Sequence, residues 1–390
     1  MSEPTIVMAG SFTFRSPVRV GIHHYAACFA RSGWRVCFLS SQLSPLHLLR
    51  KADRMHAREK ARLWRRGGEW REKIFAYSYG TWLPILPFAT PGFVVTHTLD
   101  CTLPNLRRVL GRQGFDRPDV LWIENPHASA LPRVLAPRVL AYRVADEIRG
   151  FEGYPRAVLD RYHQALGAAD LVVTTARPLF EKYSAQRPDG TVLYVPNGVD
   201  FEHFHAGAPE PPAEYRGVSR PIALYAGSLA PWLDQDLVAA CARRLPQFTF
   251  VFLGPASVDT SRLREAPNVR LLGSRPYEAL PAFYRHADVG IIPFKVNALV
   301  HAVNPVKLYE YLAAGLPVVA TDWRELRELQ SPARLATGTE AFCGQLTAAL
   351  ATRNARALHD YAREQDWSGR FDVILDALQA CRTGKESGAT

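Results

Sequence analysis

One segment in the last third of the chain combines charged side chains with a backbone that suits phosphate. Residues 304–322 read NPVKLYEYLAAGLPVVATD, in which a loop enters a helix, Gly315 ends it and a buried strand follows. Backbone N–H groups and the dipole at a helix N-terminus attract anions, and Lys307 adds a full positive charge. Glu310, one turn later, can accept hydrogen bonds from ribose hydroxyls. The alternative is an ordinary helix-to-strand connection with a surface lysine and glutamate.

A carboxylate in the first half of the chain has the chemistry of a general base. Asp146 lies in LAYRVADEIRGF (140–151), directly after an expected strand. A carboxylate is the simplest side chain to accept the proton that a hydroxyl group loses as it attacks an electrophile. The alternative is that Asp146 or Glu147 caps the following helix, and the two roles are compatible.

Basic side chains gather in the loop after the first expected strand and at the start of the next helix. Arg15 and Arg19 could bind a phosphate group of a substrate that accepts the transferred group. His23 and His24 follow the first strand, where an α/β fold of this kind forms the edge of its ligand cleft. Solvated surface arginines and a packed, hydrogen-bonded histidine are the alternatives.

The elements that must position these residues alternate between short β-branched strands and helical patterns. TIVMAG, WRVCFLS, DVLWIEN, RVLAYRVAD and DLVVTTA are expected strands of a parallel, doubly wound α/β sheet, which binds ligands at the carboxyl ends of its strands. A second series, beginning at PIALYAGS, follows a proline-rich stretch. We therefore expect a first domain over 1–205, a linker over 206–220 and a second domain over 221–367. A final helix at about 368–383 is expected to pack back on the first domain.

Several segments of the second half resemble one family of enzymes. Residues 304–322 resemble the donor-site motif of GT-B glycosyltransferases of the family 4-like group, P-x-K-x-x-E-x-x-A-x-G-x-P-V-V. Four other stretches support the match: PNGVDFEHF (196–204), ALYAGSLAPWLDQDLV (223–238), FVFLGP (250–255) and residues 268–294. The resemblance implies two Rossmann-like domains facing a cleft, with a nucleotide-sugar on the second. It implies donor contacts at Gly227, Ser228, Gly254, Arg275, Pro276, Phe294, Asn304, Pro305, Val306, Lys307 and Glu310.

The first half resembles a narrower group, the glucuronosyltransferases of xanthan assembly (GumK), over residues 11–40 and 140–151. This resemblance implies an inverting, membrane-associated enzyme that uses UDP-glucuronate, with Asp146 as its base and His23 near the acceptor or the leaving group. Glu310 replaces a glutamine of the xanthan enzyme. Ala302 occupies the position of the first of two glutamates in many retaining relatives. The donor sugar and the stereochemistry therefore stay open.

The net positive charge of the chain lies entirely in its first half. The formal net charge is +10, and residues 1–200 hold 27 Lys and Arg against 17 Asp and Glu. Residues 51–73 alone carry nine basic and four acidic side chains interleaved with Leu63, Trp64 and Trp70. This pattern favours an anionic membrane surface, with the proline-broken apolar stretch 82–95 dipping into the headgroups. A solvated helix face is the alternative. Nucleic acid is not expected, since no module that binds it is recognisable.

Other features bear on compartment and cofactors. Six scattered cysteines without metal-ligand spacing indicate reduced thiols, no signal peptide is recognisable, and no apolar stretch reaches the roughly 20 residues of a membrane helix. Asp234 and Asp236 form a D-x-D pattern that is expected to cap a helix. We therefore expect a cytoplasmic protein, peripheral on the inner face of the cell membrane, with no metal and no cofactor besides its nucleotide-sugar.

The function expected from the sequence is inverting, metal-independent transfer of a sugar from a UDP-sugar to a lipid-linked or polysaccharide acceptor. A retaining transferase and a sugar-nucleotide epimerase are the enzymatic alternatives. The non-enzymatic alternative is a scaffold protein at the membrane that binds sugar nucleotides without catalysis.

Overall fold

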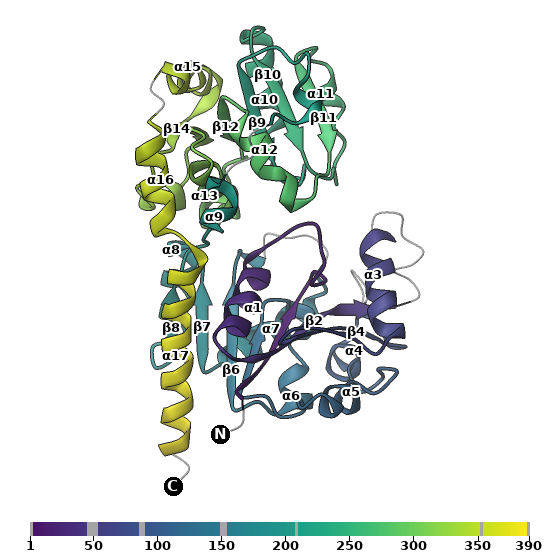
Figure 1. Ribbon diagram of the computed structural model, residues 1–390. Helices are drawn as coiled ribbons and strands as arrows, with labels where there is room; N and C mark the ends of the chain where they lie inside the picture. Colours follow the sequence, from purple (N-terminus) through teal and green to yellow (C-terminus); the bar gives the residue numbers. More distant parts are fainter. Residues whose placement is uncertain are drawn as a thin grey trace. The chain divides into compact units, whose positions relative to one another are not determined.

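The computed structural model describes residues 3–44, 54–85, 90–148, 154–206, 210–351 and 354–387 (Figure 1). The chain forms two compact units. The first comprises Met1–Pro196 and Phe371–Thr390, and the second comprises Asn197–Arg370. Each unit is built on one sheet.

The sheet of the first unit has the strand order β3-β4-β2-β1-β5-β6-β7-β8, and every pairing is parallel except that of β3 with β4. Its central strands read as unbroken apolar runs because both faces are covered. The strands are β1 (Thr5–Gly10), β2 (Arg35–Leu43), β3 (Glu69–Arg71), β4 (Ile74–Gly80), β5 (Val120–Ile123), β6 (Val139–Val144), β7 (Leu171–Thr174) and β8 (Thr191–Tyr194).

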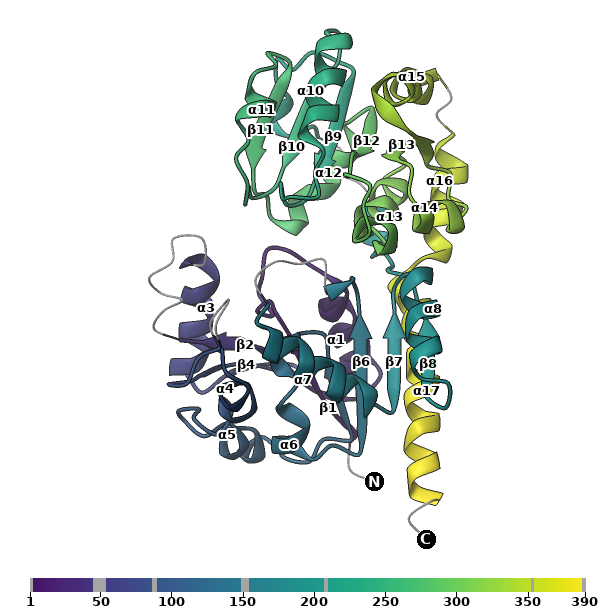
Figure 2. The same ribbon diagram turned by 180° about the vertical axis from the view of Figure 1, so that it is seen from behind.

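Helices cover both faces of this sheet. Figures 1 and 2 show α1 and α17 on one face and α7 on the other. Phe29 of α1 meets Phe371 of α17 edge to face, with ring centroids 4.8 Å apart. The helices are α1 (Gly21–Arg31), α3 (Arg54–Arg65), α4 (Gly92–His97), α5 (Leu106–Arg112), α6 (Leu131–Leu135), α7 (Arg156–Gly167), α8 (Arg177–Gln186) and α17 (Trp367–Ser387), which begins in the second unit.

The second unit has a six-stranded, wholly parallel sheet in the order β11-β10-β9-β12-β13-β14. The order reverses direction between β9 and β12, and parallel sheets bind ligands outside the carboxyl ends of their strands at such a point. The strands are β9 (Ile222–Ala226), β10 (Thr249–Leu253), β11 (Val269–Gly273), β12 (Val289–Ile292), β13 (Val318–Thr321) and β14 (Arg334–Ala336).

The helices of the second unit precede, connect and follow these strands. They are α9 (Phe201–His205), α10 (Gln235–Arg244), α11 (Ser261–Arg264), α12 (Leu280–Arg285), α13 (Val306–Ala313), α14 (Arg324–Glu328), α15 (Gly338–Ala351) and α16 (Ala355–Glu364). α10 packs against α15, and α13 packs against α16.

The unit boundary lies earlier in the chain than the expected linker. Phe201 and Phe204 belong to the apolar core of the second unit, and so does Tyr215 from within the expected linker. The Asn197 side chain donates to the backbone oxygen of Asn304 at 2.7 Å. These contacts assign the stretch after Pro196 to the second unit, whereas proline content alone placed the boundary about ten residues later. Residues 207–209 of the expected linker lie outside the described residues.

The basic segment 51–73 is not one continuous helix. Its described part forms α3 and then the edge strand β3, which pairs antiparallel with β4. Residues 51–53 lie outside the described part, as do residues 86–89 of the apolar stretch. Among the described helices, none has the length and apolar character needed to cross a membrane.

Candidate functional site

Two glycine-containing loops approach each other at the carboxyl ends of β9 and β10. Gly227 and Gly254 have φ angles of 148° and 140°, a region that side chains other than glycine rarely adopt. A Cβ on Gly254 would lie 2.0 Å from the carbonyl oxygen of Gly227. The Tyr225 hydroxyl donates to the backbone oxygen of Ser228 at 2.9 Å and holds the turn. This turn is therefore fixed.

Lys307 extends from the first turn of α13 toward that turn. A Cβ on Gly227 would lie 3.0 Å from Cε and 3.3 Å from Nζ of Lys307. The ammonium group lies 4.8 Å from the ring centroid of Phe294 and 5.3 Å from that of Tyr225. Pro305 is the N-cap residue of α13, and the first turn holds no acidic side chain. The positive end of the helix and the lysine charge thus meet where a diphosphate would be stabilised.

Glu310 lies one turn further along α13 and is buried. Its Oε2 accepts a hydrogen bond from the Tyr284 hydroxyl at 3.1 Å. Burial raises the pKa of Glu310 from its ordinary 4.5 to about 7, although the Tyr284 hydrogen bond and the Lys307 charge oppose the rise. A carboxyl group of this kind is close to half-ionised near neutral pH, so a ligand that donates hydrogen bonds to it would favour the charged form.

Phe294 forms an aromatic wall beside these groups. It is buried and stacks on Trp323 at 5.7 Å between centroids with an interplanar angle of 19°. Thr321 fixes the loop, since its hydroxyl oxygen accepts from Phe294 N at 3.0 Å and its hydroxyl donates to Phe294 O at 2.8 Å. The wall is therefore held from both β12 and β13.

Two of the expected donor residues have internal partners. Asn304 is buried, where its Oδ1 accepts from Asn197 N at 3.1 Å and its Nδ2 donates to Glu325 at 2.9 Å. Arg275 pairs with Glu214 and donates to the Leu272 carbonyl at 2.6 Å. Asn304 therefore joins segments of the second unit rather than presenting its side chain to a ligand.

The remaining expected donor residues flank these groups. Pro305 and Val306 start α13, and Pro276 precedes a single 3-10 turn at Tyr277–Ala279. They offer backbone geometry rather than side-chain chemistry.

Of the two acids in the D-x-D pattern, Asp234 acts as the helix cap that the sequence predicts. The Asp234 carboxylate accepts from Leu237 N at 3.0 Å at the start of α10. Asp236 pairs with Arg262 at 2.9 Å. Both acids are thus engaged in structural contacts.

In the first unit, Asp146 follows β6 beside a buried ion pair. Arg143 of β6, whose side chain is 2% exposed, donates to Glu124 at 3.0 Å, and Trp122 Nε1 donates to the other oxygen of Glu124 at 2.9 Å. Burial alone would lower the pKa of Arg143, but the charges of Glu124 and, more weakly, of Asp146 raise it above its ordinary value. The partly buried Asp146 therefore lies in the field of a permanent positive charge.

Gly21 leaves the space that Arg143 occupies. A Cβ on Gly21 would lie 2.7 Å from the guanidinium, which also lies 5.5 Å from the ring centroid of Tyr25. The guanidinium is thereby held against the first turn of α1, next to the loop that carries Arg15 and Arg19.

Glu147 differs from Asp146 in its contacts, since it forms an ion pair with Lys182 of α8. The next described helix is α7, whose N-cap residue is Pro155 and whose N-terminus has no side-chain cap. Neither acid therefore caps α7. The capping alternative stays open for the segment directly after β6, because residues 149–153 lie outside the described residues.

His23 is a packed histidine. It is 1% exposed, its Nδ1 accepts from Val20 N at 3.2 Å and its Nε2 lies 3.0 Å from the Thr13 carbonyl oxygen. Burial lowers its pKa to about 4, with a smaller contribution from Arg19, so the ring is neutral at physiological pH. Its hydrogen bonds favour the structural alternative, in which it holds the loop after β1.

The other expected acceptor residues lie nearer the surface. Arg15 forms an ion pair with Glu69, which also binds Arg62 of α3 at 2.6 Å. The Arg19 guanidinium lies 6.0 Å from the centroid of Phe14, and His24 is half-buried on α1. Arg15 therefore also ties the loop to the basic helix.

Sequence reasoning did not single out Glu124 and Tyr284. Glu124 lies near the end of the expected strand DVLWIEN and directly follows β5, and its place at the carboxyl edge of a parallel sheet was a usable signal. Tyr284 could not be found in that way, because it meets Glu310 from a helix 26 residues earlier in the chain.

Two family models match the two halves of the chain. The model described as "Glucuronosyltransferase GumK, N-terminal domain" matches residues 8–175, and the model described as "Glycosyl transferases group 1" matches residues 220–360. Each model covers less than half of the chain, and the chain as a whole has the GT-B fold. A Bacillus subtilis protein assigned to teichuronic acid biosynthesis, the glycosyltransferase TuaH, is 34% identical over 194 residues. That match covers 46% of this chain and 49% of TuaH, about half the length of each.

Solved structures share the GT-B fold at low sequence identity. Sucrose-phosphate synthase from Thermosynechococcus elongatus superposes with a TM-score of 0.67 at 17% identity, covering 99% of this chain and all of the other. HepE from Anabaena in complex with UDP gives 0.63 at 14%, covering 97% and 100%. A UDP-forming α,α-trehalose-phosphate synthase from Burkholderia xenovorans gives 0.66 at 13%, covering 96% and 100%.

Proposed function

We propose that this GT-B protein transfers a sugar from a UDP-sugar to a lipid-linked or polysaccharide acceptor. The observation that carries the proposal is Lys307, whose ammonium group lies beside the Gly227 turn at the N-terminus of α13. In the transition state the leaving diphosphate gains negative charge, and preorganised positive charge at that point lowers the barrier. Glu310 would accept hydrogen bonds from the ribose hydroxyls of the donor, and the aromatic wall at Phe294 would border its nucleotide base.

Asp146 is proposed as the general base of an inverting reaction. It would accept the proton of the acceptor hydroxyl while that oxygen attacks the anomeric carbon. Arg143 and Glu124 would hold the segment in place, since their ion pair is almost fully buried. UDP-glucuronate is one candidate donor, supported by the match of the first half to the GumK domain.

The proposed site of action is the inner face of the cell membrane, where the protein would be peripheral. The exposed basic residues of α3 support this, because anionic headgroups attract clustered Lys and Arg.

A thermal-shift screen against UDP, GDP and ADP and their sugar conjugates tests the donor site. We expect selective stabilisation by UDP compounds that is lost in Lys307→Ala, with Lys385→Ala as a matched control distant in sequence. No response to any nucleotide would refute the transferase proposal, whereas a UDP shift without transfer of the sugar would favour the scaffold protein. Adding EDTA should leave turnover unchanged if the reaction is metal-independent.

The base is tested separately in Asp146→Asn. We expect turnover to fall by roughly 100-fold or more with UDP binding intact, because general-base catalysis contributes on that order. Near-normal turnover would remove Asp146 from the mechanism. The anomeric configuration of the product, read by NMR, distinguishes the inverting reaction from a retaining one.

A further inference from the structure

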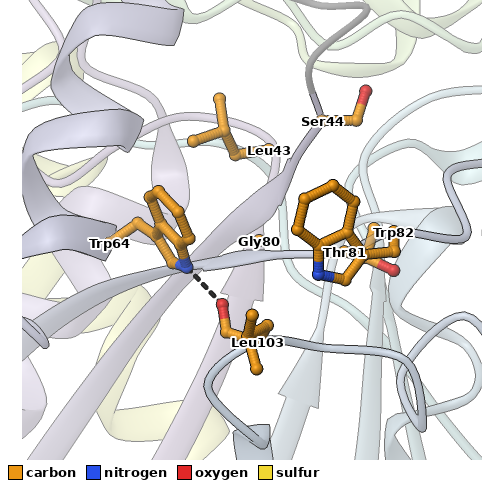
Figure 3. A pocket seen from close by; sticks show the side chains of 7 residues that line it. All are labelled: Leu43, Ser44, Trp64, Gly80, Thr81, Trp82 and Leu103. Carbon is orange, nitrogen blue, oxygen red and sulfur yellow. Dashed lines mark hydrogen bonds between the residues drawn. The ribbon is translucent and has the colours of Figure 1, made fainter.

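An apolar pocket opens on the first unit, next to the basic helix α3. Figure 3 shows the indoles of Trp64 and Trp82 on opposite sides of it, with Leu43 and Leu103 between them. Ser44, Gly80 and Thr81 complete the lining. The empty volume is about 420 Å³, open solvent at the mouth included.

The walls of the pocket are fixed so that carbon rather than polar atoms faces it. The Trp64 indole N–H donates to the Leu103 carbonyl, the contact drawn dashed in Figure 3. Leu103 N in turn donates to Gly80 O at 3.0 Å, and the Thr81 hydroxyl donates to Thr98 O at 3.0 Å. A Cβ on Gly80 would lie 2.8 Å from Trp64 Nε1, so glycine leaves room for the indole.

The rim of the pocket exposes large apolar side chains to solvent. Trp82 is 72% exposed and Leu103 is 54% exposed, and Phe93 on the nearby α4 is 68% exposed. Apolar side chains gathered beside a hollow mark a surface that binds something. Tryptophan at such a rim is typical of a membrane interface, where the ring lies at headgroup level.

Exposed arginines lie on two elements that adjoin residues of the pocket lining. Arg58 and Arg65 lie on α3, which supplies Trp64, and Arg66 directly follows it. Arg107 and Arg108 lie on α5, which starts three residues after Leu103 and contains no acidic residue. These charges are spread along two helices instead of converging on one point. That distribution matches a membrane surface, which presents many phosphate groups, better than a ligand with a single phosphate group.

We propose that this pocket takes one hydrocarbon chain of an anionic phospholipid at the bilayer surface, while the flanking arginines contact lipid phosphates. The proposal rests on the membrane attachment in the proposed function and names the site where it occurs. The Trp64 indole is held by its hydrogen bond and forms the fixed wall. Trp82 forms the outer wall and inserts together with Leu103.

Cosedimentation of the full chain with phosphatidylcholine vesicles, with and without phosphatidylglycerol, tests this. We expect binding only with phosphatidylglycerol. Trp82→Asp and Leu103→Asp should each weaken it roughly tenfold or more, because a carboxylate opposes both insertion and the anionic surface. Val373→Asp is the matched control, since Val373 is 50% exposed on α17, and it should bind like the wild type. Circular dichroism confirms that each variant is folded.

Phosphatidylglycerol brominated on its acyl chains locates the contact. Tryptophan fluorescence should be quenched, and less so in Trp82→Phe. Equal binding by wild type, Trp82→Asp and Leu103→Asp would overturn the proposal. Binding that requires an isoprenoid phosphate added to phosphatidylcholine vesicles would also overturn it, since the occupant would then be an isoprenoid chain. The UDP thermal shift needs no vesicles, so failure of the lipid site and failure of the transferase proposal are distinguishable.

Discussion

The buried carboxyl group of Glu310 makes the stability of the second unit depend on pH in a direction opposite to that of an ion-paired acid. Its pKa is about 7 in the folded chain against an ordinary 4.5. The stabilising contribution of the protonated form is therefore fully present below pH 4.5 and is lost as the pH rises through 7. At about 1.4 kcal/mol per pH unit, the loss amounts to about 3 kcal/mol by pH 8.

Glu310→Gln tests this, because glutamine keeps the shape of the protonated acid and can still accept the Tyr284 hydroxyl. We expect the variant to match the wild type in stability at pH 4.5 and to exceed it at pH 8 by about 3 kcal/mol. In thermal unfolding that corresponds to roughly 2 to 4 °C per kcal/mol for a unit of this size.

Unfolding should be followed from pH 4.5 to 8 without ligand, with Glu265→Gln as a control because Glu265 lies on the surface. Equal pH profiles for the wild type and Glu310→Gln would refute the reasoning, since the carboxyl group would then not be protonated in the folded state.

Two further substitutions probe the turn and the ion pair. Gly254→Ala should destabilise the second unit by roughly 2 kcal/mol or more, because the added Cβ meets the Gly227 carbonyl, and it should weaken UDP binding in thermal shift. The control is Gly273→Ala, which should destabilise the unit less, because Gly273 has a positive φ but no such neighbour. Arg143→Met should lower the free energy of unfolding, measured with denaturant, by about 3 to 5 kcal/mol, because it leaves Glu124 buried without its charge partner. Adding Glu124→Gln to this variant should restore part of that stability. No recovery would show that the ion pair is not what stabilises this site.

The sequence predicted those parts of the fold that depend on local pattern. TIVMAG is β1 residue for residue, and the strands after the linker appear in the expected order as β9 to β13. β4 was not predicted, although all its residues are buried, because it directly follows the charged segment 51–73 and was not separated from it. β14 was missed because three residues carry too little periodicity to be recognised.

The site was predictable where motifs are local and less so where partners are distant. The positions of Lys307 and Gly227 were expected from the donor motif, and their proximity follows from the order of β9 and β12 in the sheet. The burial of Glu310 depends on Tyr284, which no local spacing indicates. The packing of His23 against the Thr13 carbonyl likewise depends on how the loop after β1 closes.

The return of α17 to the first unit also sets an order of events during synthesis. Phe29 is fully buried in the finished protein and rests on Phe371, which the ribosome makes only after the entire second unit. Until then the nascent first unit exposes the apolar face of α1, a surface prone to aggregation or chaperone binding. α17 therefore completes the first unit only after the second unit has been made, and a chain truncated after residue 366 would leave its first unit without this cover.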